Sequence, residues 1–407
     1  MLRLAHVSRA AVSARAAIPT TRVALLQLAR YSVDANLKKT PLFGLHEKLN
    51  AQFVDYAGFA MPVMYKGTSH IESHKWVREK AGLFDVSHML QHRFTGPAAT
   101  EFLEKITPAD LQALQPYSST LSVLLTNEGG IIDDLIISKH GDNDYYVVTN
   151  AGCRDKDLAF LAKEAKEFGD KLVHDTIGGG LIALQGPEAA SALQKLTNYD
   201  LSQIKFGQSA WVDFGAGTKY HVARGGYTGE DGFEVSIPDD AASVAFSEAL
   251  LENEDVIAVG LAARDSLRLE AGMCLYGHEL SEELTPVEAG LTWVVGKARR
   301  SGDRAAFNGS DKILAQIKDK SATKARVGLF NDGPAPREGV AILNEAGEKV
   351  GEVTSGCKSP SLNKNIGMGY VNKPFNKSGT KLTLDIRNKK RPAEVVKMPF
   401  VAHKYFK

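Results

Sequence analysis

The order of hydrophobic and polar residues divides this chain into two regions of different character. Up to about residue 296, amphipathic helical runs alternate with short apolar strands. From about residue 326 onwards only short strands remain, punctuated by Gly and Pro. This change predicts an α+β protein that ends in a small β-barrel or sandwich. Between the two regions, residues 297–324 are polar and are expected to be partly helical.

The predicted helices are 70–82, 97–107, 155–168, 188–196, 241–252 and 261–271. The predicted strands of the first region are 120–126, 131–138, 145–149, 181–184, 210–214, 220–224 and 233–237. Those of the second region are 327–330, 340–343, 350–353, 366–371, 382–386 and 393–397.

One predicted strand places two adjacent acids inside an apolar run, N-E-G-G-I-I-D-D-L-I-I at 127–137. Because side chains alternate along a strand, Asp133 and Asp134 are expected on opposite faces. An unpaired buried carboxylate is costly or has a shifted pKa. In one interpretation the first acid caps a hairpin turn and the second is solvated at a sheet edge. In the other, a carboxylate in a cleft meets a cationic or nitrogen-rich ligand.

A further candidate acid, Glu234, follows a glycine-rich stretch. Residues 224–238 read R-G-G-Y-T-G-E-D-G-F-E-V-S-I-P, in which the glycines permit positive φ and close backbone approach. The ligand spacing of a calcium loop is absent. Glu234 is either a solvated acid in a hairpin, or a carboxylate that accepts two parallel N–H bonds from an amino-pyrimidinone edge.

Two arginines lie four residues apart on the predicted helix 261–271, so Arg264 and Arg268 share one of its faces. They form either a structural salt-bridge cluster with Asp265 or Glu270, or a clamp for a ligand carboxylate. The clamp is plausible chemically because Arg offers a planar, bidentate fork.

Composition and charge exclude several classes of protein. The chain has 407 residues and a net charge of +1, which gives no electrostatic case for nucleic acid. No apolar stretch is long enough to span a bilayer. The three cysteines, Cys153, Cys274 and Cys357, form no C-x-x-C pair and are expected to be buried free thiols in a reducing compartment.

The sequence also lacks the motifs of nucleotide and metal sites. No G-x-G-x-x-G follows a strand, and no P-loop is complete, so no nucleotide is expected. Two pairs of histidines have i, i+4 spacing, His70 with His74 and His88 with His92. Neither pair has a third ligand in view or an H-E-x-x-H motif, so no metal is expected.

The first 33 residues contain no Asp or Glu but carry five arginines. This composition is typical of a mitochondrial transit peptide, and residues 29–32, A-R-Y-S, predict a cut after Tyr31. Removing the five arginines leaves 44 basic residues against 48 acidic ones, a net charge of −4.

Eight collinear stretches resemble the aminomethyltransferase family, the T-proteins of the glycine cleavage system. They are residues 83–89 (L-F-D-V-S-H-M), 130–135, 148–153 (V-T-N-A-G-C), 183–187 (A-L-Q-G-P), 226–232, 260–275, 354–361 (T-S-G-C-K-S-P-S) and 397–401 (K-M-P-F-V). Eight motifs in the family's order are more specific than any one of them. The resemblance spans nearly the whole chain beyond the N-terminal segment.

The resemblance implies a three-domain cloverleaf around a central folate-binding channel, with a β-rich C-terminal barrel domain. Residues 1–31 would be the transit peptide and 306–407 the barrel. The folate-binding region, 32–305, would consist of two interleaved α+β domains. These are expected at about 32–85 with 171–256, and 86–170 with 257–305.

The resemblance also implies the activity. The methylene carbon of an aminomethyl group, carried on the lipoyl arm of H-protein, is transferred to tetrahydrofolate. The products are 5,10-methylenetetrahydrofolate, ammonia and the dihydrolipoyl protein. The expected partners are lipoylated H-protein and other glycine cleavage components, in the mitochondrial matrix, with no membrane or nucleic acid. A basic stretch, Lys297, Arg299, Arg300 and Arg304, is a candidate docking patch for an acidic carrier, or simply a solvated junction.

The family's functional residues carry over to eight positions. Asp134, rather than Asp133, matches the carboxylate near the reacting folate nitrogens. Glu234 matches the residue that binds the pterin edge, and Arg264 the one that binds the acidic tail. The other pocket positions are Met89, Asn150, Tyr227, Trp293 and Tyr405. Met89 and Trp293 are alternatively core residues, Asn150 and Tyr227 turn residues, and the tail after Val401 departs from the family pattern.

The main alternative is a non-enzymatic member of the same folate-binding group, an iron–sulfur assembly factor. Those proteins carry a K-G-C-Y-x-G-Q-E signature. The aligned stretch here, 270–279, reads E-A-G-M-C-L-Y-G-H-E and follows the aminomethyltransferase pattern.

Overall fold

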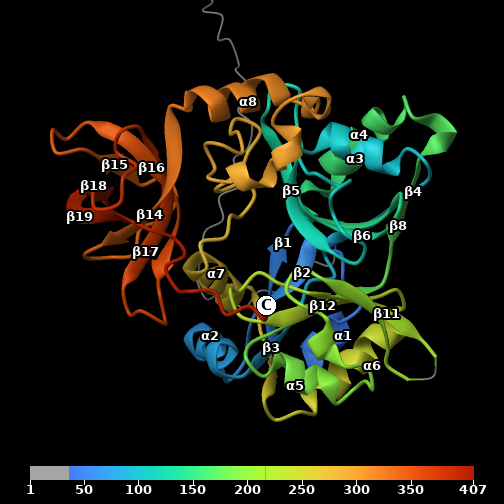
Figure 1. Cartoon of the computed structure of the whole chain (residues 1–407). Helices are drawn as coiled ribbons and strands as arrows, with labels where there is room; N and C mark the ends of the chain where they lie inside the picture. Colours follow the sequence, from blue (N-terminus) through green and yellow to red (C-terminus); the bar gives the residue numbers. More distant parts are fainter. Residues whose placement is uncertain (1–35, 216) are drawn as a thin grey trace, which may run out of the picture. The chain divides into compact units, whose positions relative to one another are not determined.

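The computed structural model describes residues 36–215 and 217–407, so the expected transit peptide, 1–31, lies outside the described residues. The described strands form a two-stranded sheet, a six-stranded sheet, a five-stranded sheet and a closed six-stranded barrel (Figure 1). Together with the helices, they confirm the predicted α+β class. In the described part of the chain, no helix is both long and apolar enough to cross a membrane.

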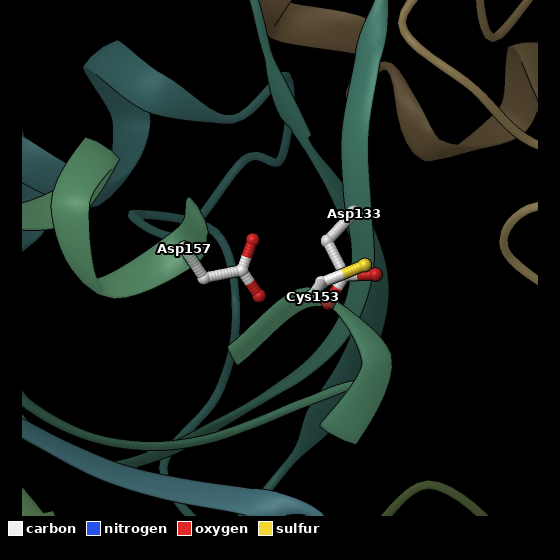
Figure 2. Close-up of side chains that lie close together, drawn as sticks. All are labelled: Asp133, Cys153 and Asp157. Carbon is white, nitrogen blue, oxygen red and sulfur yellow. The ribbon is translucent and has the colours of Figure 1, made fainter. Parts of the chain in front are cut away.

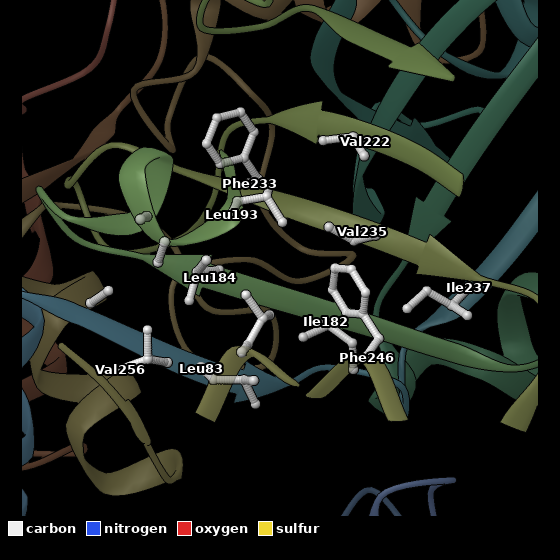
Figure 3. Packing of buried hydrophobic residues seen from close by; sticks show 14 of the residues in the cluster. Leu83, Ile182, Leu184, Leu193, Val222, Phe233, Val235, Ile237, Phe246 and Val256 are labelled. Atoms are coloured by element: carbon white, nitrogen blue, oxygen red, sulfur yellow. The ribbon is translucent and has the colours of Figure 1, made fainter. Parts of the chain in front are cut away.

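The six-stranded sheet has the strand order β10-β11-β12-β9-β3-β13. Its strands are β3 (Ala81–Asp85), β9 (Gly180–Gln185), β10 (Ser209–Asp213), β11 (Lys219–Arg224), β12 (Gly232–Ile237) and β13 (Val256–Ala258). Alternate residues of the central strands, such as Phe233 and Val235 on β12, are fully buried (Figure 3). Leu193 of α5 (Ala189–Gln194) and Phe246 of α6 (Asp240–Leu251) pack into the same core. Since side chains alternate, Glu234 lies on the other face of β12.

The five-stranded sheet has the order β5-β6-β7-β4-β8. Its strands are β4 (Leu90–Thr95), β5 (Ser119–Leu125), β6 (Ile131–Gly141), β7 (Asp144–Thr149) and β8 (Val173–Ile177). Leu135 and Ile137 of β6 face a core that includes residues of α3 (Ala99–Ile106) and α4 (Arg154–Ala165). The register between β5 and β6 shifts beside Ile132, where β6 carries one extra residue, a β-bulge. Because β6 lies between β5 and β7, neither acid of the pair lies on an edge strand.

The last region closes into a barrel with the order β14-β17-β16-β15-β18-β19, which decides between the predicted barrel and sandwich. Its strands are β14 (Lys324–Asn331), β15 (Ala341–Leu343), β16 (Lys349–Lys358), β17 (Asn365–Asn372), β18 (Lys381–Ile386) and β19 (Lys389–Val396). Leu329, Ile342 and Leu384 fill its centre without solvent exposure. Outside the barrel, Ile366 and Met368 pack with Leu269 of α7.

The remaining strands, β1 (Ala51–Tyr56) and β2 (Phe59–Tyr65), form an antiparallel pair. The helices are α1 (Phe43–Lys48), α2 (His70–Glu79), α3 (Ala99–Ile106), α4 (Arg154–Ala165), α5 (Ala189–Gln194), α6 (Asp240–Leu251), α7 (Leu261–Glu270) and α8 (Ser310–Asp319). Helix α2 begins with a capping box, in which Ser69 and Glu72 bond each other's backbone N–H.

The prediction that a helix continues to Gly82 was wrong, because α2 ends at Glu79 and Gly82 lies within β3. A Cβ atom at Gly82 would lie 2.6 Å from a methyl carbon of Val77 and 2.7 Å from one of Val259. The glycine is therefore needed for close packing between the strand and its neighbours, and not as a helix cap.

Candidate functional site

Asp134 and Asn150 form the centre of the candidate site. Asp134 lies on β6 and is half-buried, and Asn150 directly follows β7, the neighbouring strand. The side-chain nitrogen of Asn150 donates to Asp134 Oδ1 at 2.9 Å and to the backbone oxygen of Asp134 at 3.0 Å. The amide group of Asn150 therefore fixes the carboxylate of Asp134 close to the backbone of β6.

Asp133 lies on the opposite face of β6 and is fully buried. Its Oδ2 accepts from the backbone nitrogen of Asn150 at 2.8 Å, and its Oδ1 from the side-chain nitrogen of Asn150 at 2.9 Å. Burial, and then the charge of Asp133, raise the pKa of Asp134 to about 7. Asp134 therefore changes charge close to neutral pH, which suits a group that meets a developing cation.

Arg264, on α7, is the cation of the site. Its guanidinium carbon lies 4.6 Å from the ring centroid of Tyr227, and it forms no ion pair with any described residue. The Tyr227 hydroxyl donates to the backbone oxygen of Cys274, which fixes the ring under the guanidinium. An arginine without an internal partner is available to an external anion.

Glu234 is half-buried on β12, between β11 and β9, so the interpretation as a solvated hairpin acid was wrong. Burial raises its pKa, and the charge of Arg264 opposes that rise. The same arginine charge also opposes the rise at Asp134. The structure thus brings Asp134, Asn150, Tyr227, Glu234 and Arg264 into one electrostatic environment.

Arg268 does not join Arg264 in a clamp, as one interpretation of the sequence held. It is almost fully buried and forms ion pairs with Asp265 and Glu279, both at 2.8 Å. It also donates to the hydroxyl of Ser355 in β16 at 2.8 Å. For this arginine the salt-bridge interpretation is confirmed, with Glu279 in place of Glu270 as the second partner.

The other three predicted pocket residues have separate surroundings. Met89 is half-buried and packs against a hydrophobic cluster that includes Val86 and Val148. Trp293 is 60% exposed, so the alternative that it is a core residue was wrong. Tyr405 stacks on Phe206, with ring centroids 3.8 Å apart. No hydrogen bond or ring contact between described residues joins these three to Asp134.

One member of each histidine pair, His74 and His92, is hydrogen-bonded inside the fold. His74 is buried, with its nitrogens 2.7 Å from the Ser266 hydroxyl and 3.0 Å from Glu270 Oε2. Within residues 36–215 and 217–407, the group whose donor atoms lie close enough to hold a metal ion is Asp133, Cys153 and Asp157 (Figure 2).

The basic stretch 297–304 is not the free cationic surface that one prediction assumed. Arg299 is 1% exposed and donates to backbone oxygens at Glu104, Ala109, Arg304 and Ala306. Arg304 bridges Glu104 and Asp110 at 2.8 and 2.7 Å. Only Lys297 and Arg300 remain exposed, so the docking patch as a four-residue unit was wrong.

The cysteines are free, as predicted, but only Cys153 is buried, and Cys274 and Cys357 are half-buried. Cys153 and Asp157 beside Asp133 were missed as part of the site. The signal was present in N-A-G-C-R-D-K-D, because Asp157 falls in the first turn of an amphipathic helix, four residues after Cys153. Which sheet that turn would contact was not readable from the sequence.

The arrangement can bind a ligand that has a nitrogen-rich edge and an acidic tail. Glu234 offers a carboxylate to N–H donors, Arg264 offers a guanidinium to an anion, and Asp134 offers a carboxylate to a developing positive charge.

Two family models match the chain. Residues 42–299 match the GCVT N-terminal domain, and residues 324–402 match the glycine cleavage T-protein C-terminal barrel domain.

Named relatives agree with these matches. The chain is 50% identical to "Probable aminomethyltransferase, mitochondrial" of Schizosaccharomyces pombe, over 92% of this chain and 96% of the relative. It is also 50% identical to "Aminomethyltransferase, mitochondrial" of Saccharomyces cerevisiae, over 92% and 97%. The solved structure of glycine cleavage system aminomethyltransferase T from Bartonella henselae is 38% identical, with a TM-score of 0.85, over 91% of this chain and 100% of that one.

Proposed function

This chain belongs to the glycine cleavage T-protein family and is an aminomethyltransferase, and from that premise we propose which residues perform the reaction. The acceptor is tetrahydrofolate, and the donor is the aminomethyl group on the lipoyl arm of H-protein. The observation that carries the proposal is the half-buried carboxylate of Asp134, held by Asn150 and set near the unpaired Arg264.

Asp134 stabilises positive charge in the transition state. When the aminomethyl donor loses its dihydrolipoyl thiolate or ammonia, an iminium-like cation remains. A fixed carboxylate beside that cation lowers its energy and orients the folate nitrogen that attacks the methylene carbon. Two folate nitrogens each form a C–N bond to the methylene carbon and each give up a proton. These bonds replace the C–S bond, whose sulfur leaves as the dihydrolipoyl thiol, and the original C–N bond, whose nitrogen leaves as ammonia. Because the charge develops during the reaction, Asp134 contributes more to turnover than to binding.

Glu234 and Arg264 bind the two ends of the folate. The carboxylate of Glu234 accepts N–H bonds from the amino-pyrimidinone edge of the pterin, and burial strengthens such bonds. Arg264 binds the carboxylate tail. The ring of Tyr227 lies against the guanidinium group of Arg264 and positions it for this contact. Met89, Trp293 and Tyr405 are proposed to line the same ligand path, Trp293 from a largely exposed position.

The carrier and the compartment are part of the proposal. The relatives are named mitochondrial proteins, which supports a mitochondrial location for this chain, and we place it in the matrix. The carrier is lipoylated H-protein, which works with the other glycine cleavage components. Arg299 and Arg304 already form intramolecular hydrogen bonds and ion pairs. If this stretch contacts an acidic surface of the carrier, the contact therefore comes from Lys297 and Arg300, which are exposed.

The activity is tested by measuring ammonia released from aminomethylated H-protein with and without tetrahydrofolate. We expect release that requires tetrahydrofolate and yields 5,10-methylenetetrahydrofolate in equal amount. A chain that binds tetrahydrofolate but releases no ammonia would support the non-enzymatic iron–sulfur assembly factor instead.

A further inference from the structure

A second carboxylic acid lies behind the reacting one, on the far face of β6. Asp157, in the first turn of α4, is fully buried, and its side chain points from the helix towards Asp133 (Figure 2). One donor atom from each of Asp133, Cys153 and Asp157 lies within 4.8 Å of the others. Neither carboxyl oxygen of Asp157 has a hydrogen-bond partner among the residues that the structure describes.

No positive charge neutralises these two buried acids. Among residues 36–215 and 217–407, neither Asp133 nor Asp157 forms an ion pair. Lys156 is next to Asp157 in the chain, but its ammonium group contacts the hydroxyl of Tyr276 and, at 3.3 Å, Glu282. Two carboxylates this close together in a buried place cannot both be ionised without a large cost. At least one of them must hold a proton.

The hydrogen bonds decide which acid holds it. Asp133 accepts two N–H bonds from Asn150, which favour its ionised form. Asp157 has no such pair of bonds. Thr149 and the charge of Lys156 favour its ionised form, but burial and the charge of Asp133 outweigh them, so its neutral form is favoured. A neutral Asp157 can donate a hydrogen bond, and the carboxylate of Asp133, which lies beside it, can accept it in addition to those from Asn150.

We propose that Asp157 is a positioning residue that stays protonated and donates a hydrogen bond to Asp133. Asp133 then keeps Asn150, and through Asn150 also Asp134, in the reactive arrangement. The inference rests on the proposed role of Asp134. The chain of contacts runs from Asp157 in α4, through Asp133 and the amide of Asn150, to Asp134 Oδ1.

The donated hydrogen bond also acts on the charge of Asp134. The negative charge of Asp133 is the second cause, after burial, of the raised pKa of Asp134. A hydrogen bond from Asp157 spreads that charge and reduces the repulsion. On the site face, the charged and titratable groups that act on Asp134 or feel its charge are Arg264, Tyr227 and Cys274.

Titration supports the same assignment. Burial, and then the charge of Asp133, raise the pKa of Asp157 to about 9, with smaller opposing effects of Thr149 and of Lys156. Cys153, the third member of the cluster, has a pKa that burial raises well above its ordinary value, so it stays a neutral thiol. Asp133, Cys153 and Asp157 offer donor atoms that suit a divalent cation. Both oxygens of Asp133 already accept hydrogen bonds from Asn150, however, which favours a proton on Asp157 over a bound cation.

The test compares Asp157→Ala with the isosteric Asp157→Asn, in the chain that begins at Ser32. Asp157→Asn keeps a neutral donor facing Asp133, so it should retain most of kcat. In Asp157→Ala, the acidic limb of the kcat profile should move up by about one pH unit, with kcat at pH 7 reduced up to about tenfold. The KM for tetrahydrofolate should change little in both variants. A residue that only stabilised the fold would lower the thermal midpoint without moving the limb.

A second measurement needs no activity. In the Asp134→Asn background, infrared difference spectra at about pH 8 should show the carbonyl stretch of a protonated carboxylic acid, one unit below the pKa of Asp157. Replacing Asp157 by Asn in that background should remove the band. Failure of the role of Asp134 would leave this band in place, so the two proposals fail separately.

Three outcomes would overturn the inference. The first is an Asp157→Ala enzyme that folds and keeps the wild-type acidic limb. The second is an Asp157→Asn enzyme as impaired as the Ala variant, which would mean that an ionised carboxylate, or one bound to a metal, is required. The third is an infrared spectrum without the acid band.

Discussion

At the scale of single residues, the adjacent acids of β6 show what the sequence could predict. Alternation along a strand correctly predicted that Asp133 and Asp134 face opposite ways. It could not say which acid faces α4, because that depends on packing between segments distant in the sequence. In the structure Asp133 is sealed against α4, and Asp134 is half-buried on the other face. The choice of Asp134 came from the family resemblance, and its role remains a proposal.

The pH dependence of turnover follows from the titration of Asp134. If the reaction needs its ionised form, kcat should fall as the pH drops through about 7, the value to which burial and then Asp133 raise its pKa from 3.8. The measurement is the pH profile of kcat for methylene transfer at saturating substrates. A limb that persists unchanged in Asp134→Asn would belong to another group.

The same titration predicts an effect on stability with a fixed sign. The folded-state pKa of Asp134 is raised, so the folded chain binds more protons than the unfolded chain between about pH 4 and pH 7. Stability should therefore fall as the pH rises through this window. Asp134→Asn should be more stable than the wild type at pH 8, by on the order of 4 kcal/mol. Urea unfolding at pH 5 and pH 8 checks this, since the gain should shrink at the lower pH.

At the scale of elements, helix α7 separates two arginines that the sequence presents as equivalent. Helical spacing predicted that Arg264 and Arg268 share a face. It could not predict that Arg268 would form an ion pair with Glu279, beyond a turn, and a hydrogen bond with Ser355, in the barrel. Arg264 is left without an ion pair among the described residues. Tertiary contacts therefore decided which arginine is available to a ligand.

Substituting the two arginines should have different consequences. Arg264→Ala should weaken binding of tetrahydrofolate but spare a pterin that lacks the tail, since the lost contact is with the tail carboxylate. Glu234→Gln should weaken both ligands. Arg268→Ala should lower the free energy of unfolding by about 3–5 kcal/mol, because it leaves Glu279 buried and unpaired. Calorimetry with both ligands, together with urea unfolding, measures these effects. Equal losses for both ligands in Arg264→Ala would remove its assigned role.

Two glycines provide a matched test of packing. Gly82→Ala should destabilise the fold by about 1–3 kcal/mol, because the new methyl group would overlap Val77 and Val259. Gly44, exposed in α1, has no atom within 4 Å of a built Cβ. Gly44→Ala should leave stability unchanged or raise it by up to about 1 kcal/mol. Equal effects of the two variants in thermal melts would contradict close packing of the strand at Gly82.

At the scale of the whole molecule, the regular parts were predictable and the contacts between them were not. The barrel strands β14 to β19 were predicted near their observed positions, because alternating apolar residues and Gly or Pro turns are local signals. Strands β1, β2, β3, β4, β8 and β13 were missed. Strand β2 contains Pro62, β8 is largely exposed, and β13 has three residues and pairs in parallel with β3. Such strands are defined by their partners more than by their own pattern.

The N-terminal segment gives a prediction for the protein in its cell. Residues 1–31 should be absent from protein purified from the mitochondrial matrix, because an arginine-rich segment without acids is drawn inwards by a negative-inside potential. N-terminal sequencing should begin at about Ser32. A native protein that retains Met1 would contradict this expectation.

The central claim is that methylene transfer depends on the carboxylate of Asp134. The most direct test is tetrahydrofolate-dependent ammonia release from aminomethylated H-protein, measured for Asp134→Asn alongside tetrahydrofolate binding. The variant should bind tetrahydrofolate nearly as the wild type does and lose turnover about 100-fold or more, as expected when an electrostatic contact with the transition state is removed. Near-normal turnover in Asp134→Asn, with Asp133→Asn folded but inactive, would contradict the claim and assign the reaction to the other acid.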